Sequence, residues 1–151
     1  LLDRALLAAP AHVDARLMRG LMLAEEGRYE EVAEVCREGL RLTPGQPDLQ
    51  LNLGLALSQS GLAEEATSVL RAALVAHPGH VGLARAYANA LNYLPGAEAA
   101  EALAAHEHHG RVIEALLPGP YAPPVRPARV GADGRARRLR IGLLSADLRT
   151  H

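Results

Sequence analysis

The sequence repeats itself with a period of 34 residues, and this period constrains the fold more than any other feature. Pro10, Pro44 and Pro78 are spaced by 34 and 34 residues. The same spacing relates further positions: Gly20, Gly54 and Ala88; Gly27 and Gly61, followed by Pro95; Ala5, Gly39 and Ala73; Leu6, Leu40 and Leu74; and Leu23, Leu57 and Leu91. Because so many positions agree on one period, we expect a stack of similar structural units.

Each unit has the sequence pattern of two antiparallel helices. The stretch from Asp14 to Glu25 is periodic in apolar residues, and Gly27 follows it as a plausible left-handed helix cap. The second helix is expected from Tyr29 to Leu42, because Pro44 prevents its continuation. The unit is therefore predicted to be a helical hairpin.

The amino-acid composition favours the same fold. The chain has 29 Ala and 27 Leu against 2 Ile and 9 Val, with no Phe or Trp. A sheet-rich core draws on β-branched and aromatic residues, so this balance indicates helices. No apolar run approaches the roughly 18 residues of a membrane span. We expect a cytoplasmic protein whose single cysteine, Cys36, is a buried thiol of the second helix.

Small residues recur inside the first helix of each unit, at Gly20, Gly54 and Ala88. Glycine in a helix interior costs about 1 kcal/mol relative to alanine. Two helices that cross closely at that point would offset this cost. We therefore expect tight helix crossings at these three positions.

This pattern resembles the tetratricopeptide repeat, whose period is about 34 residues. The unit that ends at Pro78 matches best, with Leu53-Gly54-Leu55-Ala56-Leu57 followed by Gly61, Ala66, Leu70 and Ala73. We expect residues 1–12 to be the end of a preceding repeat, 13–80 to be two repeats, and 81–117 to be a divergent capping repeat. Further repeats are expected upstream. The last helix of the capping repeat is predicted to end at Gly110.

The charge distribution changes near residue 110. Residues 1–110 carry eight Arg against fourteen Asp and Glu, whereas residues 111–151 carry eight Arg against three. Residues 118–138 are rich in Pro and Arg and are expected to be a linker. The short apolar segment Leu139–Ser145 has the pattern of a buried β-strand, so residues 139–151 are expected to open an α/β domain.

Two clusters in this part of the chain invite other interpretations. The linker arginines could bind nucleic acid, but no aromatic residues are interleaved with them, so a solvated linker is favoured and no nucleic-acid partner is expected. His106, His108 and His109 invite a metal interpretation, because His106 and His109 are spaced i, i+3 and could share a helix face. No third ligand lies nearby to complete a site with these two, so surface or packing roles are favoured and no metal site is expected.

The order of these parts resembles the junction in O-linked N-acetylglucosamine transferases and SPINDLY-like proteins, glycosyltransferase family 41. The motifs that carry this resemblance are Asn89-Ala90-Leu91-Asn92-Tyr93-Leu94-Pro95 and the segment from Arg140 to His151, which contains Ser-x-Asp-x-x-x-His. The resemblance implies a mainly α chain: a tetratricopeptide-repeat superhelix followed by the first β-strand of a Rossmann-like (GT-B) lobe.

The resemblance also implies an activity. The complete protein would be an inverting transferase that moves N-acetylglucosamine from UDP-GlcNAc to Ser or Thr of acceptor proteins, which the repeats bind. It needs no cofactor beyond this nucleotide sugar, which would bind outside the present segment, on the remainder of the catalytic domain. The 151-residue segment alone is expected to be inactive. The alternative is a tetratricopeptide scaffold that binds proteins without catalysis.

The resemblance assigns four site residues. His151 would be catalytic, either as a general base or as a substrate-positioning residue, since imidazole titrates near neutral pH. Asp147 would help position the acceptor, or would be an ordinary turn residue. Asn52 occupies the position of an asparagine ladder that holds an acceptor peptide, and Asn89 would extend this polar strip. Met18 and Ala86 stand at the equivalent positions, so the ladder is interrupted.

Overall fold

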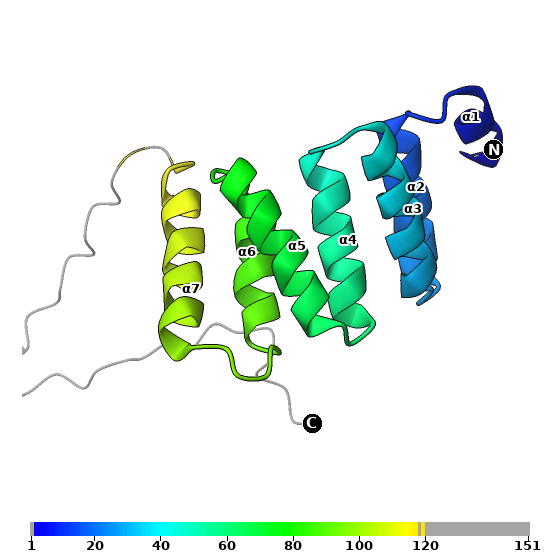
Figure 1. The fold of residues 1–151 in the computed structure, drawn as a ribbon. Helices are drawn as coiled ribbons and strands as arrows, with labels where there is room; N and C mark the ends of the chain where they lie inside the picture. The colour runs from blue at the N-terminus through cyan, green and yellow to red at the C-terminus, as the bar shows by residue number, and fades with distance from the viewer. Residues whose placement is uncertain (1, 118, 120–151) are drawn as a thin grey trace, which may run out of the picture. The chain divides into compact units, whose positions relative to one another are not determined.

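The computed structural model describes residues 2–117 and 119, which fold into helices without any β-strand in these residues. The helices are α1 (Leu2–Ala8), α2 (Val13–Glu25), α3 (Tyr29–Leu42), α4 (Pro47–Gln59), α5 (Ala63–Ala76), α6 (Val81–Leu91) and α7 (Ala99–Glu114). They follow one another along a stack in chain order (Figure 1). The expected strand at residues 139–145 and the expected linker at residues 118–138 lie outside the described residues, apart from Gly119.

The helices pack as consecutive antiparallel hairpins, as the repeat pattern predicts. Each helix from α1 to α6 contacts the next one in the chain. In addition, α2 contacts α4, and α4 contacts α6, whereas the Cα atoms of α3 and α5 nowhere approach within 8 Å. The first helices of the hairpins are therefore closer together than the second helices. The face formed by α2, α4 and α6 is the inner side of the stack.

Left-handed glycines end the first helices of two hairpins. Gly27 has a φ of 74° and Gly61 a φ of 77°. In each case the residue that follows donates its backbone N–H to a carbonyl in the last turn, from Arg28 to Leu23 and from Leu62 to Leu57, both at 2.9 Å. Only glycine adopts this conformation without a steric cost. The predicted cap at Gly27 is confirmed.

The amino ends of α2, α4 and α6 share a capping device that also follows the 34-residue period. The side chains of His12, Gln46 and His80 accept backbone N–H groups from Ala15, Leu49 and Leu83 at 3.3, 2.7 and 3.2 Å, respectively. These bonds satisfy N–H groups that have no partner inside the helix. Side-chain capping therefore marks the start of three successive repeats.

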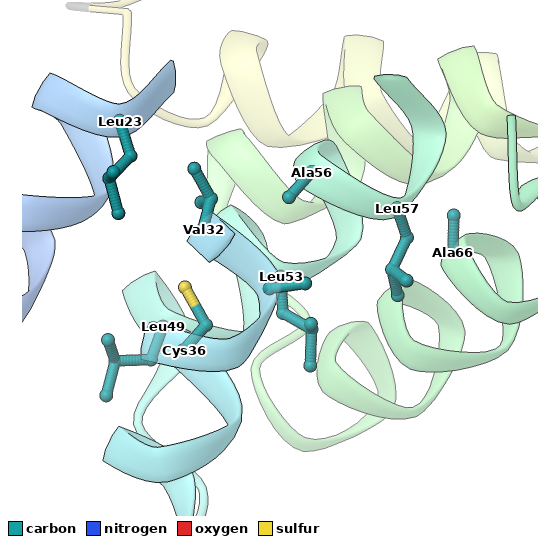
Figure 2. Close-up of a cluster of buried hydrophobic side chains, with 9 residues drawn as sticks. Leu23, Val32, Cys36, Leu49, Leu53, Ala56, Leu57 and Ala66 are labelled. Atoms are coloured by element: carbon teal, nitrogen blue, oxygen red, sulfur yellow. The ribbon is translucent and has the colours of Figure 1, made fainter. Parts of the chain in front are cut away.

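The core is built from the apolar positions that recur with the period. One cluster joins α2, α3 and α4 to the start of α5, and Figure 2 draws Cys36 there among Val32, Leu49 and Leu53. Burial raises the pKa of the Cys36 thiol to about 11. The prediction that Cys36 is buried is confirmed. A second cluster continues the core from Leu70 to Ala105.

The three small positions on the first helices differ in how tightly they are packed. A Cβ atom at Gly54 would lie 2.5 Å from Cδ2 of the fully buried Leu70, so a close crossing is confirmed there. At Gly20 the nearest atom would be Cγ1 of Val32 at 3.7 Å, which is ordinary van der Waals contact. The expectation of an equally tight crossing at Gly20 is therefore wrong. Ala88 is buried, with room for its methyl group.

The last hairpin differs from the others in its connection and in its final helix. Gly110 lies inside α7, which continues to Glu114, so the predicted end at Gly110 is wrong. A hydrogen-bonded group ties α7 to the preceding helices: Tyr87 of α6 donates to Glu101 of α7 at 2.6 Å and accepts from Nε of Arg71 of α5 at 3.0 Å. Burial and the neighbouring Glu101 raise the pKa of Tyr87.

Candidate protein-interaction surface

The surface on the inner side of the stack is best defined on α4, because this helix has neighbours on every other side. It contacts α3, α5, α2 and α6. Several residues of α4 remain accessible to solvent. Leu55 and Gln59 are exposed, and Asp48, Leu51 and Asn52 are half-buried. Since the other helices cover the remaining sides of α4, these residues face inward.

The 34-residue period extends this surface to the neighbouring first helices. The equivalent residues are Asp14, Leu17, Met18, Leu21 and Glu25 on α2 and Gly82, Arg85, Ala86, Asn89 and Tyr93 on α6 and the turn after it. We call these ten residues, together with the five on α4, the inner face. Three parallel rows of side chains thus form one continuous surface.

The exposed aliphatic side chains of the inner face lie on α2 and α4. Met18 is 51% exposed and Leu21 is 54% exposed on α2, and Leu55 is 39% exposed on α4. On α6, Asn89 is exposed, and Tyr93, just beyond the helix, is 78% exposed. Exposed long apolar side chains that adjoin one another on a folded surface are typical of a place where another protein binds.

Close packing between α4 and α6 makes the surface continuous. A Cβ atom at Gly82 would lie 2.7 Å from Cδ2 of Leu51, which packs against the second core cluster. The absence of a side chain at Gly82 therefore lets Leu51 reach across to α6. Gly82 has a packing role that sequence reasoning missed, although the sequence does show a glycine there in place of Asp14 and Asp48, its equivalents in the other repeats.

Polar contacts fix both ends of the rows. Asp48 accepts from Nε2 of Gln46 at 3.3 Å, and its other oxygen lies 3.3 Å from Nε2 of His80. At the opposite end, Oδ1 of Asn92 lies 3.5 Å from Nε2 of His106. The contact between Asp48 and His80 joins two successive repeats, and the contact between Asn92 and His106 joins the end of α6 to α7 within the last hairpin.

The two predicted site residues in the described part of the chain lie on this surface. Asn52 is half-buried on α4 and Asn89 is exposed on α6. They do not occupy the same position of the repeat, since Asn52 is equivalent to Ala86 and Asn89 is equivalent to Leu55. Ala86 is buried, so a continuous asparagine ladder is absent from the described residues. The predicted residues His151 and Asp147 lie outside the described residues.

Two of the three histidines of α7 have polar contacts with neighbouring segments. Nε2 of His108 lies 2.9 Å from the carbonyl oxygen of Pro78, in the connection between α5 and α6. His106 contacts Asn92, as described above. Among the described residues, no three His, Cys, Asp or Glu side chains gather in a way that could hold a metal ion.

A cavity of about 410 Å³ lies on another part of the molecule, between α1, α2 and α3. Its buried lining residue Arg16 donates from Nε to the Pro10 carbonyl at 2.9 Å and from Nη1 to Glu38 at 3.0 Å. Arg16 in turn lowers the pKa of Glu38. Arg16 and Glu38 already form an ion pair that connects α2 to α3, so the polar groups of this cavity have a structural role. The inner face is therefore the candidate site.

Comparisons with known proteins support the fold. Residues 1–47 match the family model of the tetratricopeptide repeat. The solved structure of MamA MSR-1 C2 is similar, with 22% sequence identity, a TM-score of 0.61, and coverage of 76% of this chain and 64% of that chain. Two structures of a MamA point mutant are 23% and 24% identical, with TM-scores of 0.59 and 0.60; they match 74% and 78% of this chain and 63% and 67% of their own.

These similarities concern the fold and part of the length. The chain spans about two thirds of the MamA chains that it matches. No curated protein sequence matches it. In the part of the chain that the structure describes, no helix has the length and apolar character needed to cross a membrane. The described residues therefore form helical hairpins of the tetratricopeptide type, and residues 1–47 carry the sequence signature of that repeat.

Proposed function

We propose that this chain is a protein-binding module that holds a peptide segment of a partner protein on its inner face. The observation that carries the proposal is a set of exposed apolar side chains: Leu21 and Leu55, at equivalent places on two successive first helices, and Met18, one turn before Leu21. Stacked helical repeats form extended concave surfaces of this kind, and proteins use them for binding. The tetratricopeptide match over residues 1–47 supports the same function.

The test is a selection of peptides from a random displayed library on the purified chain, followed by affinity measurements. Leu55→Asn removes an apolar contact from the inner face and is expected to weaken the selected peptides at least about tenfold. Val75→Asn is the matched control, because Val75 is 79% exposed on α5, away from the inner face. Circular dichroism checks that both variants are folded. Equal affinities for the two variants would contradict the proposal.

A second proposal concerns the complete protein. We propose that the repeats recruit acceptor proteins for a transferase that moves N-acetylglucosamine from UDP-GlcNAc to Ser or Thr. It is supported by the sequence of Ser145, Asp147 and His151 after an apolar segment, and by the position of Asn52 on the inner face. No finding on the fold bears on this activity, so the binding module is the better supported function.

This second proposal has a direct kinetic test in the complete protein. A general base contributes roughly 10²–10⁴-fold to a rate, so His151→Ala is expected to lower kcat by about that factor. A residue that only positions the substrate would mainly raise KM. The isolated 151-residue segment is expected to transfer no sugar. A folded His151→Ala variant with full activity would overturn the assignment.

A further inference from the structure

The solvent-exposed stripe of α2 has an apolar centre and an acidic residue at each end. Asp14, Met18, Leu21 and Glu25 are all exposed and are spaced as i, i+4, i+7 and i+11, so they lie on one face of the helix. Within the described residues, neither Asp14 nor Glu25 forms a salt bridge. Their carboxylates are therefore available to a partner.

The neighbouring row on α4 continues this arrangement. On α4, which contacts α2, Leu51 and Leu55 are the repeat equivalents of Leu17 and Leu21, and Asp48 is the equivalent of Asp14. The ten inner-face positions on α2 and α4 hold three carboxylates and no basic residue. Arg85, the cation of the inner face, belongs to the α6 row. The α2–α4 half thus combines exposed apolar side chains with a negative rim.

We propose that this half of the inner face binds an amphipathic helix that has apolar side chains in its middle and Lys or Arg at both ends. Such a helix presents side chains at the same spacing as the α2 stripe, so its apolar residues meet Met18, Leu21 and Leu55 while its ends meet Asp14 and Glu25. The two carboxylates are about 16 Å apart along α2 at 1.5 Å per residue. The basic groups of the partner helix are therefore about eleven residues apart.

This inference rests on the proposed binding function and adds the chemistry of the partner. Charge complementarity favours a basic-flanked segment over an acidic one, because like charges at the rim oppose binding and unlike charges steer and orient it. The apolar centre supplies most of the affinity, and the rim supplies the selectivity. The interaction is accordingly expected to weaken as salt is added.

The experiment compares two helix-forming peptides that are identical except at their ends. Both have leucines at i, i+4 and i+7 in the middle; one is flanked by lysines and the other by glutamates about eleven residues apart. Fluorescence anisotropy with the full 151-residue chain measures both dissociation constants. We expect the lysine peptide to bind about tenfold more tightly at low salt, and this preference to shrink at high salt.

Two variants test whether the carboxylates of Asp14 and Glu25 cause the preference for the lysine peptide. The double variant Asp14→Asn and Glu25→Gln is expected to reduce the preference to about one while leaving the chain folded, since both residues are exposed. Glu64→Gln on the exposed side of α5 is the control and should leave the preference unchanged. Equal binding of the two peptides, or a preference that survives in the double variant, would overturn this inference.

The outcomes also separate this inference from the proposed function. If neither designed peptide binds but Leu55→Asn still weakens peptides selected from the library, a basic-flanked helix is the wrong partner and the binding surface is right. If Leu55→Asn changes no binding at all, the proposed function itself fails. If the lysine peptide binds more tightly than the glutamate peptide, the double variant removes this preference, and Leu21→Asn weakens binding, both stand.

Discussion

Single residues at equivalent places in the repeat have different structural roles. Gly20 and Gly54 look alike in the sequence, and the period predicts tight crossings at both, yet only Gly54 has no room for a Cβ atom. The difference depends on the residue that faces each glycine, since Leu70 fills the space at Gly54 and Val32 leaves a normal contact distance at Gly20. The period predicts where the helices cross, but side-chain packing from another helix decides how closely.

The two glycines therefore predict opposite effects of the same substitution. Gly54→Ala forces the buried Leu70 to move and is expected to cost about 1–3 kcal/mol. Gly20→Ala fits without displacement and is expected to stabilise the chain by about 0.5–1 kcal/mol, because alanine has the higher helix propensity. Urea unfolding followed by circular dichroism measures both. A destabilised Gly20→Ala variant, or an unaffected Gly54→Ala variant, would show that the crossings are packed otherwise.

A second residue-scale prediction concerns Gln50 on α4. Its Oε1 atom is buried and has no hydrogen-bond partner among the described residues. A buried polar atom without a partner costs about 1–3 kcal/mol. Gln50→Met keeps a side chain of similar length and removes this atom, so the free energy of unfolding is expected to rise. A clear fall in the midpoint of denaturation would mean that Oε1 is satisfied in solution.

At the scale of helices and their ends, the sequence predicted most boundaries because the ending signals are local. Gly27 in a left-handed conformation and Pro44 after α3 act through their own backbone geometry. Gly110 carries a similar signal but lies inside α7, with Arg111 through Glu114 continuing the helix. A glycine allows a helix to end without requiring it. The capping side chains of His12 and His80 were missed, because histidine is an unusual capping residue.

The capping role of His80 can be tested by comparing two substitutions at this position, one that removes the cap and one that replaces it by the residue found at the equivalent place. His80→Ala removes the acceptor for the Leu83 N–H and is expected to cost about 1 kcal/mol, with fraying at the start of α6. His80→Gln is expected to retain most of the stability, because Gln46 caps α4 at the equivalent place. Thermal unfolding compares the two variants. If His80→Ala and His80→Gln lose the same stability, the cap contributes little.

At the scale of the molecule, the repeat period predicted the stack of hairpins and the surface that contains Asn52 and Asn89. It did not predict the apolar and acidic character of the α2–α4 half, since exposure of Met18 and Leu21 depends on which neighbouring helices cover them. The asparagine ladder implied by family resemblance is interrupted, because Met18 and Ala86 replace two of its members. Function in repeat proteins follows the side chains on the surface more than the fold.

The central claim is that a partner protein occupies the inner face, and site-specific photocrosslinking in the complete protein tests it most directly. A photoreactive amino acid is placed at Leu55 or Asn89 on the inner face, or at Ser68 or Val75 on the exposed side of α5. We predict that Leu55 and Asn89 crosslink to the same partner protein, identified by mass spectrometry, and that Ser68 and Val75 do not. Crosslinks to a shared partner from Ser68 and Val75 alone would contradict the account.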